Sequence, residues 1–454
     1  MSAPLPRVRL FRPVPPARQL LLAVGALAIG ALTSSCTGGS TGGATAEGDA
    51  ASADAAPIVP AVPPALGAWR ATVQLPGGEL PFTLSLAESA QGLTATVENG
   101  EERVPVGRVA QEGNELLFEF PAFNNRIAAT LREDGSLAGD LTLVKRGGEL
   151  QVMPFEAYPG AVHRFQVANP SRVDLDGRWA VTFTDDEGKT SPAVGEFTQT
   201  GGELQGTFLT PTGDYRYLAG NVDGDGMALS TFDGAHAFLF RARMQQDGTL
   251  VGDFWSGTRW HERWRARRDD SAALPDPQTL TFLKAGYDSF TFEFPDQDGE
   301  PVSLDDPRFD GKVVLVALAG SWCPNCHDEA AYLAEYYRQN RDLGVEVVCL
   351  MYEHFEDFET AATQVKRFRE KFDIQYTTLV AGSSDKTKAA ETLPMLNRVL
   401  AFPTTIFVDR AGEVRRIHTG FSGPGTGQYF EDWEREFLAF MSTLLSESGA
   451  TASR

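Results

Sequence analysis

The sequence predicts a multidomain protein in which two tandem antiparallel all-β modules, each a barrel or a sandwich, precede an α/β domain. From about residue 66 to 268, segments rich in Val, Leu, Phe and Thr are separated by Gly-Gly, Asn-Gly and Asp-Gly turns, which is typical of antiparallel strands. This region repeats itself. Gly67-Ala68-Trp69 returns 110 residues later as Gly177-Arg178-Trp179, and the segment 134–141 returns 113 residues later as 247–254. From about residue 284, strand and helix patterns alternate, as in an α/β sheet.

Shifts in composition predict the domain boundaries. A chain of 454 residues is too long for one hydrophobic core. We assign residues 1–35 to a signal peptide, 36–65 to a disordered tether, 66–170 and 171–270 to the two β-modules, 271–283 to a linker, and 284–448 to the α/β domain. The tether consists largely of Gly, Ser, Thr, Ala and Pro, so it would let the folded part stand off a membrane.

Residues 1–35 have the organisation of an export signal. Four arginines and no acidic residue precede an apolar run from Leu20 to Leu32, and small residues at 33–35 lead to Cys36. This pattern predicts a secretory signal peptide, whose apolar segment is too short for an ordinary membrane-spanning helix. Cys36 after small residues resembles the lipobox of bacterial lipoproteins, although Thr33 stands where that family prefers Leu.

The lipobox resemblance implies that Cys36 is lipidated. The protein would then be exported to the cell envelope or periplasm and anchored to a membrane as a lipoprotein. The alternative is an ordinary signal peptide that leaves a free thiol at Cys36.

Charge and cysteine content exclude some classes of function. The net charge of −21 argues against binding to nucleic acid or to anionic lipid. Four cysteines are too few for a disulfide scaffold. Cys349 lies in an apolar run at 345–350, which indicates a small buried core residue.

The stretch from Gly320 to Glu329 carries the chemistry of the α/β domain. It contains Cys323-Pro324-Asn325-Cys326, between an apolar run of strand length and a segment with helical periodicity. A thiolate at a helix N-terminus faces unpaired N–H groups, so the pKa of the Cys323 thiol should fall from about 8.5 toward neutrality or below. Cys326, the less exposed of the two, is placed to attack a mixed disulfide formed by Cys323. Pro324 fits the first helical turn, where its missing N–H would be unpaired anyway.

The other elements of this domain are predicted from periodicity and from Gly and Pro positions. A hairpin-like segment at 290–304 precedes the Cys pair, and the helix after the pair runs to about Leu343 and stops at Gly344. Further helices are expected at about 357–372, 386–399 and 429–445, and strands at 376–380, 402–409 and 413–418.

Four segments of this domain, in their order and spacing, resemble the thioredoxin-like family of exported disulfide reductases that includes the membrane-tethered TlpA and ResA proteins. The resemblance covers about a third of the chain and leaves the β-modules unassigned. The matching segments are the Asp-Gly-x-x-Val-Ser-Leu segment at 298–304, Gly311–Val316, Ser321–Cys326, and Phe402-Pro403-Thr404-Thr405 before Asp409 and Gly412.

The resemblance implies a substrate site. In that family the proline matching Pro403 has a cis peptide bond, which is rare except before proline, and stands against the reactive disulfide. The backbone of Phe402 would pair with an extended substrate segment. Trp322, Pro324 and Thr404 would complete the surface that receives the substrate.

The implied activity is thiol–disulfide exchange through the Cys323–Cys326 pair. Reduction of disulfides in envelope proteins, such as apocytochrome c, is the favoured direction, with electrons from a membrane thiol carrier. No metal or cofactor besides the redox-active disulfide is expected. Thioredoxins proper have a buried Asp where this chain has Ala317. Glu329 matches an acid that tunes the thiols in the ResA branch, and we interpret it as the group that moves the resolving proton, the alternative being a solvent-facing glutamate.

Other classes of function remain open. The Cys-x-x-Cys-His pattern ending at His327 also permits covalent haem, but the thioredoxin context makes His327 a surface residue of the helix. No ligand spacing supports a metal site with His327, His354 or His418. A thiol peroxidase of the redoxin class would carry Thr where Gly320 stands. An envelope lipoprotein could instead bind a ligand or partner through its β-modules, whose Gly-x-Trp openings resemble lipocalin-type barrels, with the thioredoxin domain as a passenger.

Overall fold

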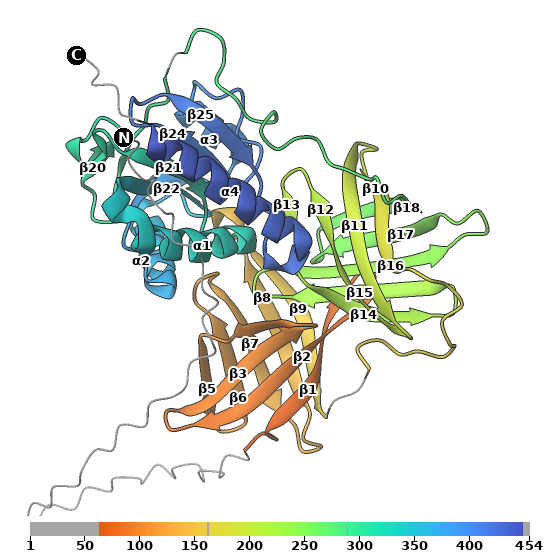
Figure 1. Ribbon diagram of the computed structural model, residues 1–454. Coiled ribbons are helices and arrows are strands. Elements are labelled where there is room, and N and C mark those ends of the chain that lie inside the picture. The colour runs from red at the N-terminus through yellow and green to blue at the C-terminus, as the bar shows by residue number, and fades with distance from the viewer. Residues whose placement is uncertain (1–62, 161–162, 288, 448–454) are drawn as a thin grey trace, which may run out of the picture. The chain divides into compact units, whose positions relative to one another are not determined.

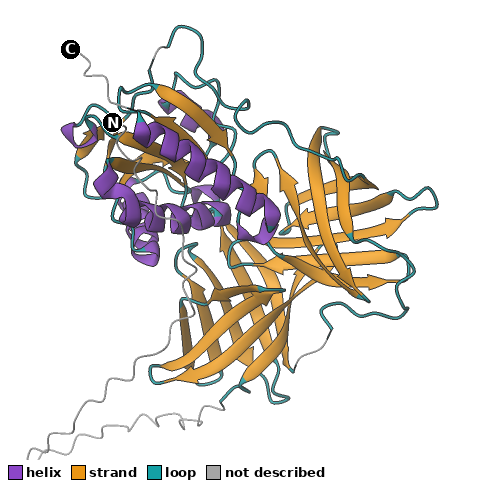
Figure 2. Ribbon diagram, viewed as in Figure 1, coloured by secondary structure: helices purple, strands orange, loops and turns teal. Residues whose placement is uncertain are grey.

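The computed structural model describes residues 63–160, 163–287 and 289–447. The predicted signal peptide and Cys36 lie outside these ranges, so their assignments stay predictions. Two β-modules precede an α/β domain (Figures 1 and 2), which confirms the predicted fold class. Within the described ranges, no helix is both long enough and apolar enough to cross a membrane.

The first β-module is an open, nine-stranded antiparallel sheet with the order β4-β3-β2-β1-β9-β8-β7-β6-β5. Strands β4 and β5 form its two ends. A short 3-10 turn, Arg146–Gly148, joins β8 to β9. The strands are β1 (Gly67–Leu75), β2 (Gly78–Ser89), β3 (Gly92–Asn99), β4 (Glu102–Pro105), β5 (Arg108–Glu112), β6 (Glu115–Phe120), β7 (Asn125–Leu131), β8 (Leu137–Val144) and β9 (Leu150–Pro159).

The second β-module is a closed eight-stranded barrel. Its order is β11-β10-β18-β17-β16-β15-β14-β12, and pairing of β11 with β12 closes the ring. The two-residue strand β13 (Gly213–Asp214) adds to β12 outside the ring. The barrel strands are β10 (Gly177–Asp185), β11 (Thr190–Thr200), β12 (Glu203–Thr210), β14 (Leu218–Asp223), β15 (Gly226–Phe232), β16 (Ala237–Met244), β17 (Leu250–Ser256) and β18 (Trp260–Arg268).

The two modules open in the same way, as the sequence repeat indicates. Trp69 and Trp179 are both buried, and each indole N–H donates to the carbonyl oxygen four residues earlier, at 2.9 Å and 3.0 Å. The tryptophans are therefore core residues. The barrel interior is filled by stacked aromatic rings, such as Phe240 with Phe208 and Phe254 at 4.7 Å and 4.3 Å between centroids, instead of enclosing a lipocalin-like ligand cavity.

The core of the open sheet is completed by the barrel. Strand β15 and the first half of β16, residues 237–240, are buried on both faces. Leu229 and Phe240 point into the barrel, whereas Phe232 and Leu239 pack into the core of the first module. The Phe232 ring lies 4.9 Å from that of Phe82 and 5.4 Å from that of Phe120. The two modules therefore share buried apolar surface.

The α/β domain has a five-stranded sheet with the order β23-β22-β21-β24-β25. Strands β21, β22 and β23 are parallel, and β24 and β25 are antiparallel to their neighbours. Its elements are β19 (Glu293–Pro295), β20 (Pro301–Ser303), β21 (Val313–Ala319), α1 (Pro324–Asn340), β22 (Val345–Glu353), α2 (Phe358–Phe372), β23 (Thr377–Ser383), α3 (Lys386–Thr392), β24 (Thr404–Val408), β25 (Val414–Thr419) and α4 (Gln428–Ser446), with 3-10 turns at Pro307–Phe309, Arg341–Leu343 and Pro424–Thr426.

Most of the predicted elements of this domain are present. Gly344, with φ +88°, adopts the left-handed conformation after the turn that follows α1, as expected for a residue that ends a helix. The helix predicted over 386–399 was wrong in length, because α3 ends at Thr392. Pro394 explains the early end, since proline cannot continue a helix and disfavours helical geometry in the residue before it.

Candidate active site

The reactive pair lies where the central strand β21 gives way to helix α1. Cys323 is the N-cap residue of α1, and it forms a disulfide with Cys326. The backbone N–H of Cys326 donates to the Cys323 sulfur at 3.2 Å. In the reduced state the same N–H would stabilise a Cys323 thiolate, as the position at a helix N-terminus predicts.

The predicted cis-proline faces this disulfide. The Phe402–Pro403 peptide bond is cis, and the Cys323 sulfur lies 3.4 Å from the carbonyl oxygen of Phe402. Thr404 is fully buried, and its hydroxyl donates to the carbonyl of Ala401 at 2.9 Å. The structure therefore brings the backbone of Phe402 and Pro403 against the reactive sulfur.

Trp322 lies beside the disulfide and is held in place on three sides. Its indole N–H donates to the carbonyl of Tyr352 at 2.8 Å. The indole stacks on the ring of His354 at 4.6 Å and meets Phe402 edge-on at 5.9 Å. Pro324 follows Cys323 in the first turn and is buried. The substrate-surface residues predicted from the sequence are thus neighbours in space.

Both cysteines are more buried than the sequence suggested. Cys323 is 5% exposed and Cys326 is 1% exposed, so their predicted order holds. An attacking thiol needs access to its partner disulfide. The low exposure of Cys323 shows that other parts of the chain cover the site.

Glu329 is buried, so the alternative that it is a solvent-facing glutamate is wrong. It is 3% exposed and accepts a hydrogen bond from the Thr405 hydroxyl at 2.6 Å. Burial raises the pKa of the Glu329 carboxyl to about 7. A carboxyl group with this pKa can both take up and release a proton near neutral pH.

Glu353 is a second buried acid at the site, and the sequence analysis missed it. It ends β22, and its two carboxylate oxygens accept from the backbone N–H and the hydroxyl of Ser321, at 2.9 Å and 2.6 Å. Burial raises its pKa to about 7. Glu353 thereby fixes the turn that leads into Trp322 and Cys323. The sequence did contain a signal. Glu353 ends an apolar strand next to the strand that leads to the Cys pair, and parallel neighbours bring their carboxyl ends to one edge of the sheet.

His327 is buried, and the prediction of a surface residue is wrong. Its ring stacks on Phe123 of the first β-module at 4.4 Å between centroids. The Lys371 ammonium donates to Nδ1 at 2.9 Å, so Nε2–H donates to the Ser321 carbonyl at 2.6 Å. Burial and the nearby Lys371 hold the pKa of His327 well below its usual range. The sequence did not predict this burial because it comes from a tertiary contact, in which the first module covers this face of the helix.

Two of the three histidines considered as metal ligands have other side-chain contacts, and the third is partly buried. His327 is engaged as above. His354 forms a hydrogen bond between its Nδ1 and the Ser384 hydroxyl at 2.9 Å, and its ring stacks on Trp322. Burial lowers the pKa of His418 to about 4. Among the described residues, no three His, Cys, Asp or Glu side chains are grouped so that they could hold a metal ion.

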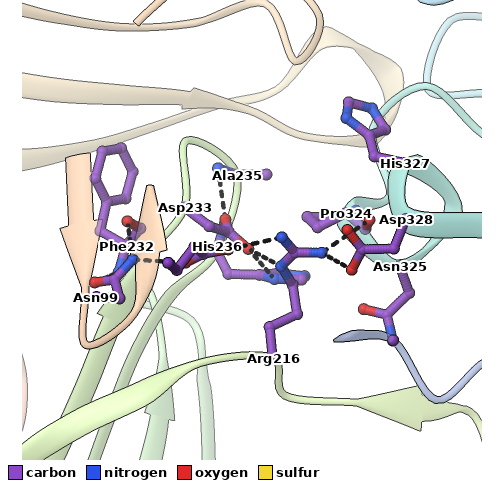
Figure 3. Close-up of polar contacts among 12 residues, drawn as sticks. Asn99, Arg216, Phe232, Asp233, Ala235, His236, Pro324, Asn325, His327 and Asp328 are labelled. Atoms are coloured by element: carbon purple, nitrogen blue, oxygen red, sulfur yellow. Dashed lines mark hydrogen bonds and ion pairs between the residues drawn. The ribbon is translucent and has the colours of Figure 1, made fainter. Parts of the chain in front are cut away.

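The second β-module also reaches the redox motif, which the sequence analysis did not foresee. The side-chain amide of Asn325 donates to the carbonyl of Asp214 at 3.2 Å. The Arg216 guanidinium donates to the carbonyl of Pro324 at 3.2 Å and forms an ion pair with Asp328. Figure 3 shows Arg216 pointing toward Pro324 and Asp328 at the start of α1. No local sequence pattern marks these residues.

A Cys-x-x-Cys disulfide at a helix N-terminus, facing a cis-proline, defines a dithiol site of the thioredoxin type. Residues 284–431 match the Redoxin family. The thiol-disulfide oxidoreductase ResA of Bacillus thuringiensis subsp. konkukian is 26% identical over 132 residues, which are 29% of this chain and 68% of that protein. ResA of Halalkalibacterium halodurans is 25% identical over 140 residues, 31% of this chain and 71% of that protein.

Solved structures of similar proteins include a thiol:disulfide interchange protein of the thioredoxin family from Chlorobium tepidum. The two sequences are 19% identical, and the match covers 38% of the present chain and 99% of the Chlorobium tepidum chain, with a TM-score of 0.26. The C-terminal region of the present chain is a thioredoxin-like redoxin domain of the TlpA/ResA type of thiol-disulfide oxidoreductases, as the sequence predicted. The family match begins after the β-modules.

Proposed function

We propose that this chain is an exported, membrane-anchored thiol–disulfide oxidoreductase that reduces disulfides of envelope proteins. The observation that supports it best is the Cys323–Cys326 disulfide facing the cis peptide bond of Pro403, with Glu329 buried on the same helix. The similarity to ResA proteins supports the same activity. Lipidation at Cys36 would hold the protein at the membrane.

The reaction follows from the positions of the two sulfurs. The Cys323 thiolate attacks a disulfide of the substrate, forms a mixed disulfide and releases one substrate thiolate. Cys326 then loses its proton and attacks the Cys323 sulfur. This step releases the second substrate thiolate and leaves the Cys323–Cys326 disulfide, so two electrons pass to the substrate. Glu329 is the group we propose to accept the Cys326 proton.

The partners of this reaction follow from its chemistry. The oxidised enzyme needs a dithiol donor, and a membrane thiol carrier would supply the electrons on the envelope side. The substrates would be disulfide-bearing envelope proteins, for example apocytochrome c. Besides its own redox-active disulfide, the reaction needs no cofactor.

The position of Gly320 counts against the thiol peroxidase alternative. A peroxidase of the redoxin class would carry Thr here. A Cβ atom at position 320 would overlap the Trp322 indole and would lie 2.7 Å from the carbonyl oxygen of Tyr352. A threonine therefore cannot be accommodated while Trp322 keeps its hydrogen bond to Tyr352.

The equilibrium reduction potential of the Cys323–Cys326 pair tests the proposal. We expect a reversible two-electron couple near or below roughly −250 mV, the range of thioredoxin-like reductants. The potential would be measured in the full chain carrying Cys36→Ser, by thiol trapping across a series of dithiol buffers. A value near about −120 mV would indicate a disulfide donor instead. The absence of a reversible couple would refute the oxidoreductase proposal.

Replacing Glu329 by Gln is expected to slow the resolving step by about 100-fold at neutral pH and to remove its inflection near pH 7. The wild-type carboxyl has a pKa of about 7 and accepts the Cys326 proton only when ionised, so the wild-type rate should rise as pH rises through 7. Rapid mixing of reduced protein with a disulfide substrate, from pH 5 to 9, measures this rate.

A matched control lies on the same helix. Glu335 is paired with Arg338 at 2.6 Å near the surface, so Glu335→Gln should leave the pH profile unchanged. The pKa of Glu353 is also raised to about 7. An inflection that persists in Glu329→Gln but disappears in Glu353→Gln would contradict the role given to Glu329.

A further inference from the structure

Three loops of the β-modules contact the α/β domain near the redox motif. The turn between β6 and β7 places Phe123 on the ring of His327. In the turn Arg146–Gly148, the N–H of Gly147 donates to the carbonyl of His354, after β22, at 2.7 Å. The third is the segment Thr210–Arg216 of the barrel, which we call the cap. It contacts Pro324 and Asn325, the two residues between the cysteines.

The cap lies between two segments near the cis-proline, which we call the walls. One wall is Asn325 of the redox motif, and the other is Gly420–Gly423, where the N–H of Gly420 donates to the Pro403 carbonyl at 2.9 Å. Asp214 touches both walls: it accepts from the Asn325 amide, and its carboxylate accepts from the N–H of Gly423 at 2.7 Å. The cap therefore joins the two walls between which a substrate segment would dock.

Only glycine fits where the cap is closest to the walls. Gly213 has φ +140°, and a Cβ atom on it would lie 2.6 Å from the Asn325 amide nitrogen. On the opposite wall, a Cβ atom on Gly420 would lie 3.2 Å from the Gly213 nitrogen. The cap backbone therefore lies against the Gly420 backbone on one side and against the Asn325 side chain on the other, which leaves no room for a second peptide segment.

Arg216 holds the cap to all three parts of the molecule. Besides Asp328 and the Pro324 carbonyl, its guanidinium pairs with Asp233 of the barrel at 3.4 Å (Figure 3). It also pairs with Glu102 of the first module at 2.7 Å. Arg216 is 9% exposed and has φ +55°, a left-handed conformation that a non-glycine residue rarely adopts. Such backbone strain persists where surrounding contacts impose it, and it is frequent at functional sites.

The cap contacts the redox motif through polar, non-covalent interactions, which can break and form again. Neighbouring Tyr215 packs its ring among Phe238 and Phe254 of the barrel, so the cap belongs firmly to the second module. Toward the redox motif it presents hydrogen bonds and one ion pair. Buried charges lose hydration when they pair, and this loss offsets much of the attraction between them. The free-energy cost of separating such a pair into water is therefore smaller than the attraction alone.

We propose that the Thr210–Arg216 cap is an intramolecular block of the dithiol, held in place by Arg216, and that a disulfide partner must displace it before Cys323 can react. This inference rests on the proposed function, because it identifies the two walls under the cap as the docking surface for the disulfide partner. It gives the β-modules a role in the reaction: they restrict the dithiol to partners able to open the contact.

The accessibility of Cys323 in the full chain tests this proposal without any substrate. In the reduced protein carrying Cys36→Ser, alkylation of Cys323 by iodoacetamide would be followed by mass spectrometry from pH 5 to 10. The plateau rate at high pH reports accessibility, and the midpoint reports the thiol pKa, so the two effects are separated. We expect Arg216→Met and Asp214→Ala to raise the plateau rate at least about tenfold, because reactivity tracks the population of the open form.

Arg243→Met is the matched control, since Arg243 is an exposed arginine on β16 of the same barrel. Its plateau rate should equal that of wild type. Hydrogen exchange provides a second readout: peptides containing Gly423 should exchange faster in Asp214→Ala, while β21 stays protected. The Asp214 variant also covers the case in which Arg216→Met fails to fold, because it leaves the Arg216 ion pairs intact.

Wild-type rates in folded Asp214→Ala and Arg216→Met would overturn the proposal, and so would a wild-type Cys323 that reacts as fast as a free cysteine. These outcomes are distinct from a failure of the proposed function. Alkylation requires only a thiol, whereas the oxidoreductase proposal depends on the reduction potential. A capped dithiol with a reversible potential supports both proposals, and an uncapped one with the same potential overturns only the cap.

Discussion

Replacing Cys326 by Ser is expected to stop turnover and to leave the protein joined to its disulfide partner through Cys323. Cys323 would still attack, but no internal thiol would resolve the mixed disulfide. Well-oriented intramolecular groups act at effective concentrations of about 10⁵ M or more, so external thiols at millimolar levels cannot replace Cys326, and turnover should fall by at least about 1000-fold. Non-reducing electrophoresis with mass spectrometry would identify the trapped adduct at Cys323.

Cys349→Ala is the control for this experiment. Cys349 is a free thiol, 2% exposed in the sheet, and burial raises its pKa well above the usual range. It should therefore form no adduct, and its replacement should leave turnover unchanged. If Cys326→Ser turned over like wild type, or if the adduct formed at Cys349, the assignment of the attacking and resolving thiols would be wrong.

The redox pair was predictable because its determinants are close together in the sequence. Cys323, Cys326 and Glu329 lie within one helical segment, and the strand before them is an uninterrupted apolar run. Pro403 lies farther along the chain but carries its own local pattern, Phe-Pro-Thr-Thr. The order of such segments also predicted an α/β sheet, and β21 is its central strand in the structure.

Arg216 and His327 could not be interpreted from the sequence because their environments come from other domains. The carboxylates of Glu102 and Asp328 that pair with Arg216 are 114 and 112 residues away. His327 is buried by Phe123 of the first module. A local pattern shows which face of an element is apolar, but it does not show which exposed loop of another module will cover a polar site.

In the strands of the β-modules, too, the local pattern does not show which part of the chain covers a face. Alternation predicts one buried face and one solvated face. In β15 and in the first half of β16 both faces are buried, because the first module covers the outer face of the barrel there. The short run Ala237-Phe238-Leu239-Phe240, apolar at every position, was a sequence signal of this arrangement. It indicates burial on two sides, yet it does not identify the covering partner.

Phe232→Ala is expected to destabilise the first β-module although the residue belongs to the second. Phe232 is fully buried on the outer face of β15, against Phe82 and Phe120. Truncating a buried phenylalanine removes its transfer free energy and leaves a cavity, at a cost of about 3–5 kcal/mol. Amide exchange in β2 and β6 should therefore become roughly 100- to 5,000-fold faster, which mass spectrometry of peptides from these strands would measure.

Val251→Ala is the matched control, since Val251 is an apolar residue of the barrel that is 36% exposed. It should change exchange in β2 and β6 little, as expected for a surface substitution. Phe208→Ala, inside the barrel, should by contrast act first on the barrel strands, because its ring packs against Phe240 and Trp264. If Phe232→Ala changed β2 and β6 no more than Val251→Ala does, the first module would have a self-sufficient core. In that case the barrel alone would hold the cap in place, because the first module could separate from the barrel without losing its fold.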